Sequence, residues 1–307
     1  MKIAVIGRTE ILYKTTELLH SLHYAVPVII TAKEAPEYTK TSKDYEELAH
    51  KLGARFILTA TIKKYIHEIK ESGCDIAVSM NYPNLIPNEV IDLFPLGILN
   101  AHGGDLPKYR GNACQAWAIL NGESKIGLCV HKMNGNELDS GDIIERDYLP
   151  ININTKVTAC WEWMNKRIPD MFVSAIRKLE KNPNYVLEKQ SKNPGDALRC
   201  YPRFPEDGKI DWNKSSIEIL RLINASNKPY AGAFCTYEDK KLIIWDAELY
   251  PDEENYLAVP GQISEIKETG SVVVITGQGK LILHNVEYEG NVCVPGQFIR
   301  SIRSRLK

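Results

Sequence analysis

An amide, an imidazole and a carboxylate at close spacing are the side chains of this sequence best suited to catalysis. Asn100 and His102 end an apolar run, and Asp139 follows in an Asp-Ser-Gly-Asp-Ile segment. Side chains of these types can meet at one carbonyl carbon, where they stabilise the oxyanion that forms during acyl transfer. Such stabilisation is usually the largest single contribution to the rate of that reaction. The pattern therefore indicates an acyl-transfer enzyme.

The remaining histidines lack comparable polar company in the sequence. A lone histidine more often makes a structural hydrogen bond than a catalytic one, so we assign none of them a role in the reaction. Three of them, at positions 20, 50 and 67, fall on expected helix surfaces exposed to solvent. The set comprises His20, His23, His50, His67, His131 and His284.

The first 150 residues alternate short apolar runs with helical patterns. This alternation predicts an α/β fold with a Rossmann-like, mostly parallel sheet and helices on both faces. Ligands of such sheets bind beyond the carboxyl ends of strands, and Asn100 stands at that place. The expected strands are 2–6, 25–30, 55–58, 75–79 and 97–100, and the expected helices are 11–22, 44–52 and 63–72.

The second half of the chain changes character. A long helix is expected at 156–180 and a polar segment rich in Asn, Pro, Lys and Gly follows it. After a helix at 215–224, closely spaced strands indicate a small β-barrel or sandwich. We therefore predict a catalytic domain over 1–185, a linker over 186–208 and a β-domain over 209–307. The expected strands of the β-domain are 232–237, 241–248, 261–268, 271–276 and 281–288.

Composition excludes several classes of function. Lys and Arg number 38 against 39 Asp and Glu, so no global positive field favours a nucleic-acid partner. The first apolar run ends at Gly7, which is too short for a signal sequence or a membrane span and favours a cytoplasmic protein. Gly7 also begins no Gly-x-Gly-x-x-Gly dinucleotide motif. The seven cysteines form no Cys-x-x-Cys pair and His102 lacks further metal ligands, so we expect neither a disulfide framework nor a metal.

The central motifs resemble those of the folate-dependent formyltransferases. The shared pattern is Asn100-x-His102, then Leu106-Pro-x-x-Arg110-Gly111, then Asp139-x-Gly141-x-Ile143. Ile210-Asp211-Trp212 and Pro260-Gly261 extend the resemblance over nearly the whole chain. Those enzymes transfer a formyl group from N10-formyltetrahydrofolate to an amine. The resemblance implies this co-substrate and a C-terminal open barrel of the oligonucleotide/oligosaccharide-binding (OB) type.

The resemblance also implies roles for individual residues. Asn100 and His102 stabilise the oxyanion, and Asp139 orients His102 and assists proton transfer. Where many members have Ser-Leu-Leu-Pro, this chain has Gly103-Gly104-Asp105-Leu-Pro, and we expect the two glycines to leave space for a bulky acceptor. The implied folate contacts are Met80, Tyr82, Leu85, Ile86, Pro87, Asn134, Gly135, Glu137 and Leu138. The implied acceptor contacts are Gly103, Gly104, Asp105, Lys108, Arg110, Arg199, Tyr201, Arg203 and Tyr230.

Two acceptors fit a formyltransferase of this length: methionyl-tRNA and a nucleotide-linked amino sugar. The segment 31–46 mixes charges of both signs and has no arginine, whereas a loop that grips tRNA phosphates should be basic. Segments 205–212 and 228–234 look more like those of the nucleotide-sugar enzymes. Arginine forks suit a diphosphate, and tyrosine can stack on a base. We therefore predict a UDP- or dTDP-linked amino sugar of surface-polysaccharide synthesis, with methionyl-tRNA, or a non-catalytic folate-binding role, as alternatives, and a homodimer as a possible assembly.

Overall fold

The computed structural model describes residues 1–251 and 254–307, which form two compact units. The first unit comprises Met1–Cys114, Ile126–Leu149 and Trp161–Cys200. The second comprises Gln115–Lys125, Pro150–Cys160 and Tyr201–Lys307. The predicted linker 186–208 is thus divided between the units, and its bounds stay a prediction.

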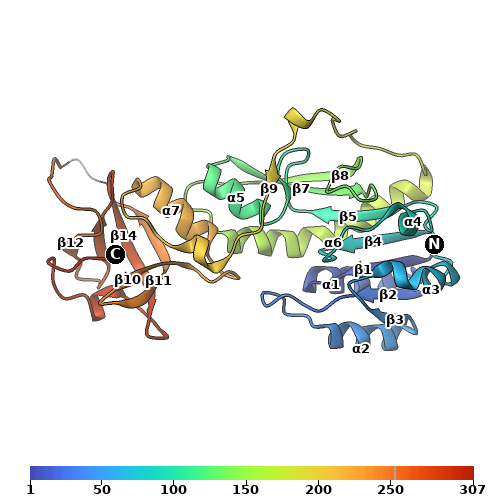
Figure 1. Cartoon of the computed structure of the whole chain (residues 1–307), viewed down its shortest axis with the longest axis horizontal. Coiled ribbons are helices and arrows are strands. Elements are labelled where there is room, and N and C mark those ends of the chain that lie inside the picture. Colours follow the sequence, from blue (N-terminus) through green and yellow to red (C-terminus); the bar gives the residue numbers. More distant parts are fainter. Residues whose placement is uncertain (252–253) are drawn as a thin grey trace. The chain divides into compact units, whose positions relative to one another are not determined.

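A seven-stranded sheet organises the first unit, in the order β3-β2-β1-β4-β5-β7-β8 (Figure 1). The strands β2, β1, β4 and β5 run parallel, whereas β7 pairs antiparallel with β5. The sheet is therefore mostly parallel, as the alternating pattern predicts. Its strands are β1 (Ile3–Gly7), β2 (Val28–Thr31), β3 (Arg55–Leu58), β4 (Ile76–Met80), β5 (Ile98–His102), β7 (Lys125–Lys132) and β8 (Ile143–Pro150).

Helices cover both faces of this sheet because successive residues of β1 point to opposite sides. Ile3 and Val5 belong to the core packed by α1, α2 and α6, whereas Ala4 and Ile6 belong to the core formed with α3 and α4. Thr9 caps α1 by accepting from Leu12 N, and Thr41 with Asp44 makes a capping box for α2. The helices are α1 (Glu10–Ser21), α2 (Ser42–Leu52), η1 (Ile62–Tyr65), α3 (Ile66–Glu71), α4 (Asn88–Ile91), α5 (Cys114–Asn121) and α6 (Val157–Lys181).

Two expected elements differ from the structure in detail. The strand expected from residue 25 begins at Val28, because Pro27 has no N–H to donate to a ladder, and Ala25 forms only an isolated bridge to Lys2. The helix expected over 63–72 is split into η1 and α3. The strands β7 and β8 and the helix α5 were not predicted, although the two strands flank the loop that carries Asp139.

An antiparallel six-stranded sheet forms the second unit, in the order β10-β11-β14-β13-β12 with β15 beside β14. Residues 304–307 join its two ends: Thr236 and Lys307 exchange hydrogen bonds of 2.7 and 2.9 Å, and Leu306 N donates to Gly261 O at 2.8 Å. The result is a small barrel around one core, as predicted. Its strands are β10 (Ala233–Tyr237), β11 (Lys240–Leu249), β12 (Ile263–Ile266), β13 (Val272–Ile275), β14 (Lys280–Tyr288) and β15 (Asn291–Cys293), with α7 (Ser216–Ala225), η3 (Pro205–Gly208) and η4 (Pro295–Gln297).

Short elements join the segment 187–200 to the rest of the first unit. The strand β6 (Arg110–Gly111) pairs in parallel with β9 (Arg199–Cys200), and η2 (Pro194–Asp196) precedes β9. Leu187 N donates a hydrogen bond to Ile143 O, and Ile143 N donates one to Glu188 O, each at 2.9 Å. The segment 187–200, which we call the closing segment, is thus tied both to the start of β8 and to β6.

Candidate active site

Asn100 and His102 lie at the carboxyl end of β5, where both neighbouring strands supply partners. The antiparallel register with β7 places Asn100 opposite His131 and His102 opposite Cys129. Both histidine side chains are buried, with 7% of His102 and 1% of His131 exposed. The polar groups predicted for catalysis therefore sit in a shielded part of the first unit, where electrostatic interactions are stronger than in water.

Asp139 reaches these residues from the loop 133–142 between β7 and β8. Its carboxylate accepts from Gly111 N at 2.9 Å, lies 3.4 Å from His102 Nδ1, and accepts from Asn100 Nδ2 at 3.4 Å. Its backbone has a left-handed φ of 47°, which a residue with a side chain adopts only at a cost. The structure thus brings together the three residues that the sequence singles out.

The protonation state of Asp139 follows from its neighbours. Burial by itself raises the pKa of this carboxyl, but the positive charges of His102 and His131 and the hydrogen bonds from His131 and Gly111 outweigh it and hold the pKa well below its ordinary value. Asp139 is therefore ionised throughout the neutral range. A carboxylate with so low a pKa is a weak base, so it is better suited to holding a charged imidazole than to taking up a proton.

His131 belongs to this site, which corrects our expectation that it has no catalytic company. Its Nε2 lies 3.2 Å from Asn100 Nδ2 and 3.5 Å from Asp139 Oδ1, and its Nδ1 lies 2.8 Å from the Lys132 carbonyl oxygen. Because a carbonyl only accepts, Nδ1 carries a proton, and Nε2 faces both the Asn100 amide and the Asp139 carboxylate. His131 thus orients the amide of Asn100. The sequence analysis missed His131 because it did not predict β7, the strand whose register places His131 opposite Asn100.

The ring of His102 is held on its other side by the turn that follows β5. Its Nε2 lies 2.6 Å from Tyr109 O and 3.7 Å from the Cys114 sulfur. Both ring nitrogens therefore face oxygen acceptors, an arrangement that the doubly protonated ring satisfies in full. In this structure, the N–H predicted to reach a substrate oxygen donates to the protein. Donation to a substrate requires the ring or the Tyr109 carbonyl to move.

Gly104 does not leave space for an acceptor, contrary to our expectation. A Cβ at this position would lie 2.3 Å from Tyr109 O and 2.5 Å from His102 Nε2, and both Gly103 and Gly104 are buried. The protein itself fills the space that the missing side chain leaves. The glycine serves the close approach between His102 and Tyr109.

We expect Gly104→Ala to lower the free energy of unfolding by about 1–3 kcal/mol, because the inserted methyl overpacks this contact. Gly195→Ala is the matched control, since a Cβ there would have its nearest neighbour at 3.5 Å. Denaturant unfolding of both variants tests this. Equal stability of Gly104→Ala and the native protein would mean that the contact between His102 and Tyr109 is not tightly packed.

Asp105 is engaged within the protein, not held open for an acceptor. Its carboxylate pairs with Arg146, whose side chain is only 9% exposed and also binds Glu188 at 3.0 Å and the Leu106 carbonyl at 2.7 Å. An ion pair of this kind is costly to break, because the buried guanidinium would lose its partner. Asp105 therefore stabilises the turn after β5.

A cavity of about 1070 Å³ lies beside the Asp139 loop in the first unit. Apolar side chains, including Ile91, Phe94, Met133 and Leu138, form part of its wall, and Glu137, Lys132 and Gln190 add polar groups. Polar and charged side chains make up more than half of the lining, and Asn100, His102 and Asp139 are not part of it. The predicted residues that line it are Asn134, Glu137, Leu138, Arg110 and Arg199.

The other predicted folate contacts lie around the 80–88 segment and outside this lining. Asn136 N donates to Ile86 O at 3.2 Å and Gly135 N donates to Asn88 Oδ1 at 3.0 Å, so the two predicted walls touch directly. Tyr82 donates to Thr59 O at 2.9 Å, and burial raises the pKa of its phenol to about 12. Met80, Ile86 and Pro87 are buried, whereas Leu85 is 49% exposed.

The predicted acceptor contacts fall in both units. In the first unit, Lys108 and Arg199 are exposed, and Arg199 is the register partner of Arg110. In the second unit, Tyr201 is 64% exposed and Tyr230 is partly buried. Arg203 donates to Asp207 O at 3.1 Å and Ser226 Oγ at 3.2 Å. The guanidinium of Arg203 therefore has a structural role within the second unit.

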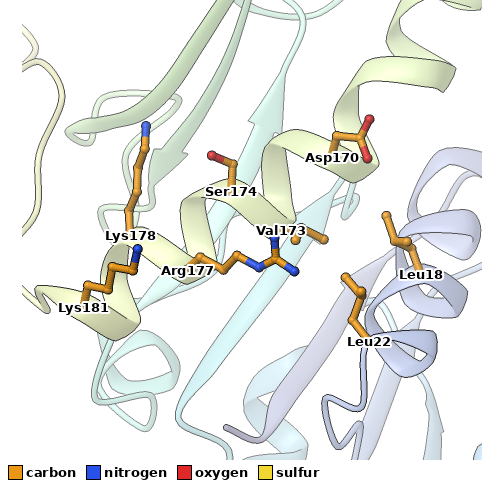
Figure 2. A pocket seen from close by; sticks show the side chains of 8 residues that line it. All are labelled: Leu18, Leu22, Asp170, Val173, Ser174, Arg177, Lys178 and Lys181. Carbon is orange, nitrogen blue, oxygen red and sulfur yellow. The ribbon is translucent and has the colours of Figure 1, made fainter.

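A second cavity of about 550 Å³ lies between α1 and α6 (Figure 2). Leu18 of α1 and Leu22 immediately after that helix form one side, and α6 contributes a mostly charged side. None of the residues predicted for catalysis lines it. Its α6 residues are Asp170, Val173, Ser174, Arg177, Lys178 and Lys181.

The described residues contain no cluster of three or more His, Cys, Asp or Glu side chains placed to hold a metal ion. None of the helices in that part of the chain is long and apolar enough to cross a membrane. All seven cysteines are free thiols, and six of them are buried.

A parallel-sheet unit with an amide, two histidines and a carboxylate at one strand end defines this chain as an acyl-transferase type of protein. Sequence models make the class specific: residues 1–176 match the formyl transferase model and residues 204–303 match the formyl transferase C-terminal domain model. The chain belongs to the formyl transferase family.

Individual relatives agree with this assignment. The chain is 28% identical over 297 residues to the methionyl-tRNA formyltransferase of Acetivibrio thermocellus, covering 95% of this chain and 93% of that one. It is 30% identical over 264 residues to the bifunctional polymyxin resistance protein ArnA of Wigglesworthia glossinidia brevipalpis, covering 81% of this chain and 38% of ArnA.

Solved structures share the fold. An N-formyltransferase from Helicobacter canadensis, in complex with folinic acid and dTDP-3-aminofucose, superposes with a TM-score of 0.70 at 20% identity over 92% of this chain and 98% of that one. HypX from Aquifex aeolicus in complex with tetrahydrofolic acid gives a TM-score of 0.62 at 15% identity, covering 98% of this chain and 47% of HypX.

Proposed function

We propose that this protein transfers the formyl group of N10-formyltetrahydrofolate to the amine of a UDP- or dTDP-linked amino sugar in the cytoplasm. The observation that carries the reaction type is the convergence of Asn100, His102 and Asp139 at the end of β5. Membership of the formyl transferase family supports the formyl group as cargo. The cavity beside the Asp139 loop supports a folate donor, because three of the implied folate contacts, Asn134, Glu137 and Leu138, line it.

Formyl transfer consists of three events. The amine nitrogen attacks the formyl carbon, the folate nitrogen leaves with the electron pair of its bond to that carbon and takes up a proton, and the amine loses one proton. In this structure the two N–H groups of the Asn100 amide face His131 and Asp139, and His102 Nδ1 lies 3.4 Å from the Asp139 carboxylate, so both side chains must turn to reach the formyl oxygen. A charged donor beside the developing oxyanion lowers the barrier. Asp139 supports that charge electrostatically.

The choice of a sugar over tRNA rests on charge. The segment 31–46 has no arginine. Two of its acidic side chains make contacts within the segment: Asp44 lies 3.2 Å from Lys40, and Glu34 accepts a hydrogen bond from Ser42 N at 3.0 Å. A segment with three lysines against four acidic residues offers little to a phosphate backbone. The dTDP-sugar complex of the Helicobacter canadensis enzyme belongs to the same fold. The 28% identity to a methionyl-tRNA formyltransferase keeps tRNA as the second candidate.

An acceptor panel tests this function. Purified protein is incubated with N10-formyltetrahydrofolate and with UDP-amino sugars, dTDP-amino sugars or methionyl-tRNA, and formation of tetrahydrofolate is followed. We expect turnover with a sugar nucleotide and none with tRNA. Turnover with tRNA alone would refute the proposed acceptor but not formyl transfer. Binding of the folate without turnover in any panel would favour a non-catalytic folate-binding protein.

A further inference from the structure

The side chain of Gln190 makes three hydrogen bonds around the Asp139 loop. Its Nε2 donates to Asp139 O at 2.9 Å and to Gly141 O at 2.7 Å, and its Oε1 accepts from Arg110 Nη2 at 2.8 Å. Gln190 is 7% exposed. Both of its N–H groups and its carbonyl are therefore used, and each bond is of ordinary length.

The loop that Gln190 holds needs external support. Asn136 and Asp139 both have left-handed backbone angles, with φ of 61° and 47°, which cost free energy in residues other than glycine. Gly141 lies so close to β7 that a Cβ there would be 1.8 Å from Lys132 O, so no side chain fits at this position. The carboxylate of Asp139 is fixed by Gly111 N on one side, and its main chain is fixed by Gln190 on the other.

We propose that Gln190 is a positioning residue for catalysis: it clamps the main chain on both sides of Ser140 so that the Asp139 carboxylate meets His102 and Asn100. This inference rests on the proposed formyl transfer. The closing segment, which the sequence presents as a polar linker, thereby becomes part of the catalytic apparatus. Arg110 completes the clamp from β6, the strand that also delivers Gly111 N to Asp139.

The expected effect follows from the geometry of the carboxylate. The contacts of Asp139 with His102 and Asn100 are each 3.4 Å long, so a small displacement of the loop breaks them. A misplacement of about 1 Å can reduce a rate by on the order of 100-fold. Loss of the clamp therefore reduces kcat more than it reduces the affinity for a ligand that does not touch Gln190.

Two substitutions separate the hydrogen bonds from the volume of the side chain. Gln190→Met keeps the volume but removes both donors. Gln190→Glu keeps the acceptor for Arg110, but its ionised carboxylate faces two carbonyl oxygens, and only its protonated form regains one donor. Glu188→Gln is the matched control, since Glu188 ties the same segment to Arg146 without touching the Asp139 loop.

The first measurement is steady-state formyl transfer. We expect kcat of Gln190→Met to fall by about 10- to 100-fold while the acceptor KM stays within about threefold of the native value. Relative to the native protein at each pH, kcat of Gln190→Glu rises as the pH is lowered and the glutamate becomes protonated, whereas kcat of Gln190→Met does not. Unchanged kcat in both variants, or equal losses in Glu188→Gln, would overturn the proposal.

The second measurement needs no acceptor. Amide hydrogen exchange of residues 134–142 is expected to be faster in Gln190→Met than in the native protein and unchanged in Glu188→Gln. Faster exchange in an otherwise folded protein that shows no formyl transfer at all would contradict the proposed function and leave the clamp intact. Native exchange in Gln190→Met would contradict the clamp itself.

Discussion

His102→Ala is expected to lower the rate of formyl transfer by at least about 100-fold, the loss that follows removal of one oxyanion-stabilising donor. The Asp139 carboxylate lies 3.4 Å from Nδ1 of His102. The substitution removes this ring, which is the main cationic partner of the carboxylate. The effect falls on kcat, because the donor acts on charge that develops in the transition state. Steady-state kinetics with the acceptor found by the panel measures it.

His67→Ala is the control for this variant. His67 lies on α3, and 80% of its side chain is exposed. Its Nδ1 is 3.5 Å from a carboxylate oxygen of Glu71, and a surface contact of this kind contributes little free energy. The formyl-transfer rate and the melting temperature of His67→Ala are expected to match those of the native protein. Turnover of a folded His102→Ala protein within about tenfold of native would exclude an oxyanion-stabilising role.

Asp139→Asn is expected to reduce formyl transfer by on the order of 100-fold and the free energy of unfolding at neutral pH by about 3 kcal/mol. The carboxylate side chain is 10% exposed and contacts two histidines, so its replacement leaves buried polar groups without a charge partner. An amide cannot hold the charged form of His102. Kinetics and denaturant unfolding at pH 7 measure the two losses.

The same variant has a predicted pH signature. The folded-state pKa of Asp139 is depressed below its ordinary value of 3.8, so its stabilising contribution is complete above that pH and is lost as the pH falls toward the folded pKa. The native protein should therefore lose stability below about pH 4 more steeply than Asp139→Asn. Asp170→Asn, an exposed carboxyl on α6, should retain the native slope. Parallel slopes for all three proteins would mean that Asp139 is not held as an ion in the folded state.

The two halves of the fold could be predicted because their patterns are local. Alternation of short apolar runs with amphipathic helices follows from burying β1 on both faces, and closely spaced strands after residue 230 follow from turns and β-branched runs. The strands β7 and β8 escaped prediction. The pairing of β7 with β5 is decided by contacts between residues about 30 positions apart, which sequence periodicity does not report, and β8 in turn follows β7 in the sheet.

The site was predictable in part for the same reason. Asn100, His102 and Asp139 carry recognisable motifs, so their chemistry could be named before their positions were known. His131 and Gln190 carry none, and each acquires its role from a partner that folding brings within hydrogen-bond distance. The free space expected at Gly104 is absent because Tyr109 and His102 fill it, and the ion pair between Asp105 and Arg146 was not predicted.

Residue type and short-range spacing were enough to predict the formyl transferase family and the mostly parallel sheet, and they singled out the three side chains to which we assign the chemistry. Only the tertiary structure decided how the three are held. Their orientation depends on hydrogen bonds from β7, from the turn after β5 and from the closing segment, and the geometry of those bonds is fixed by packing between segments distant in the chain.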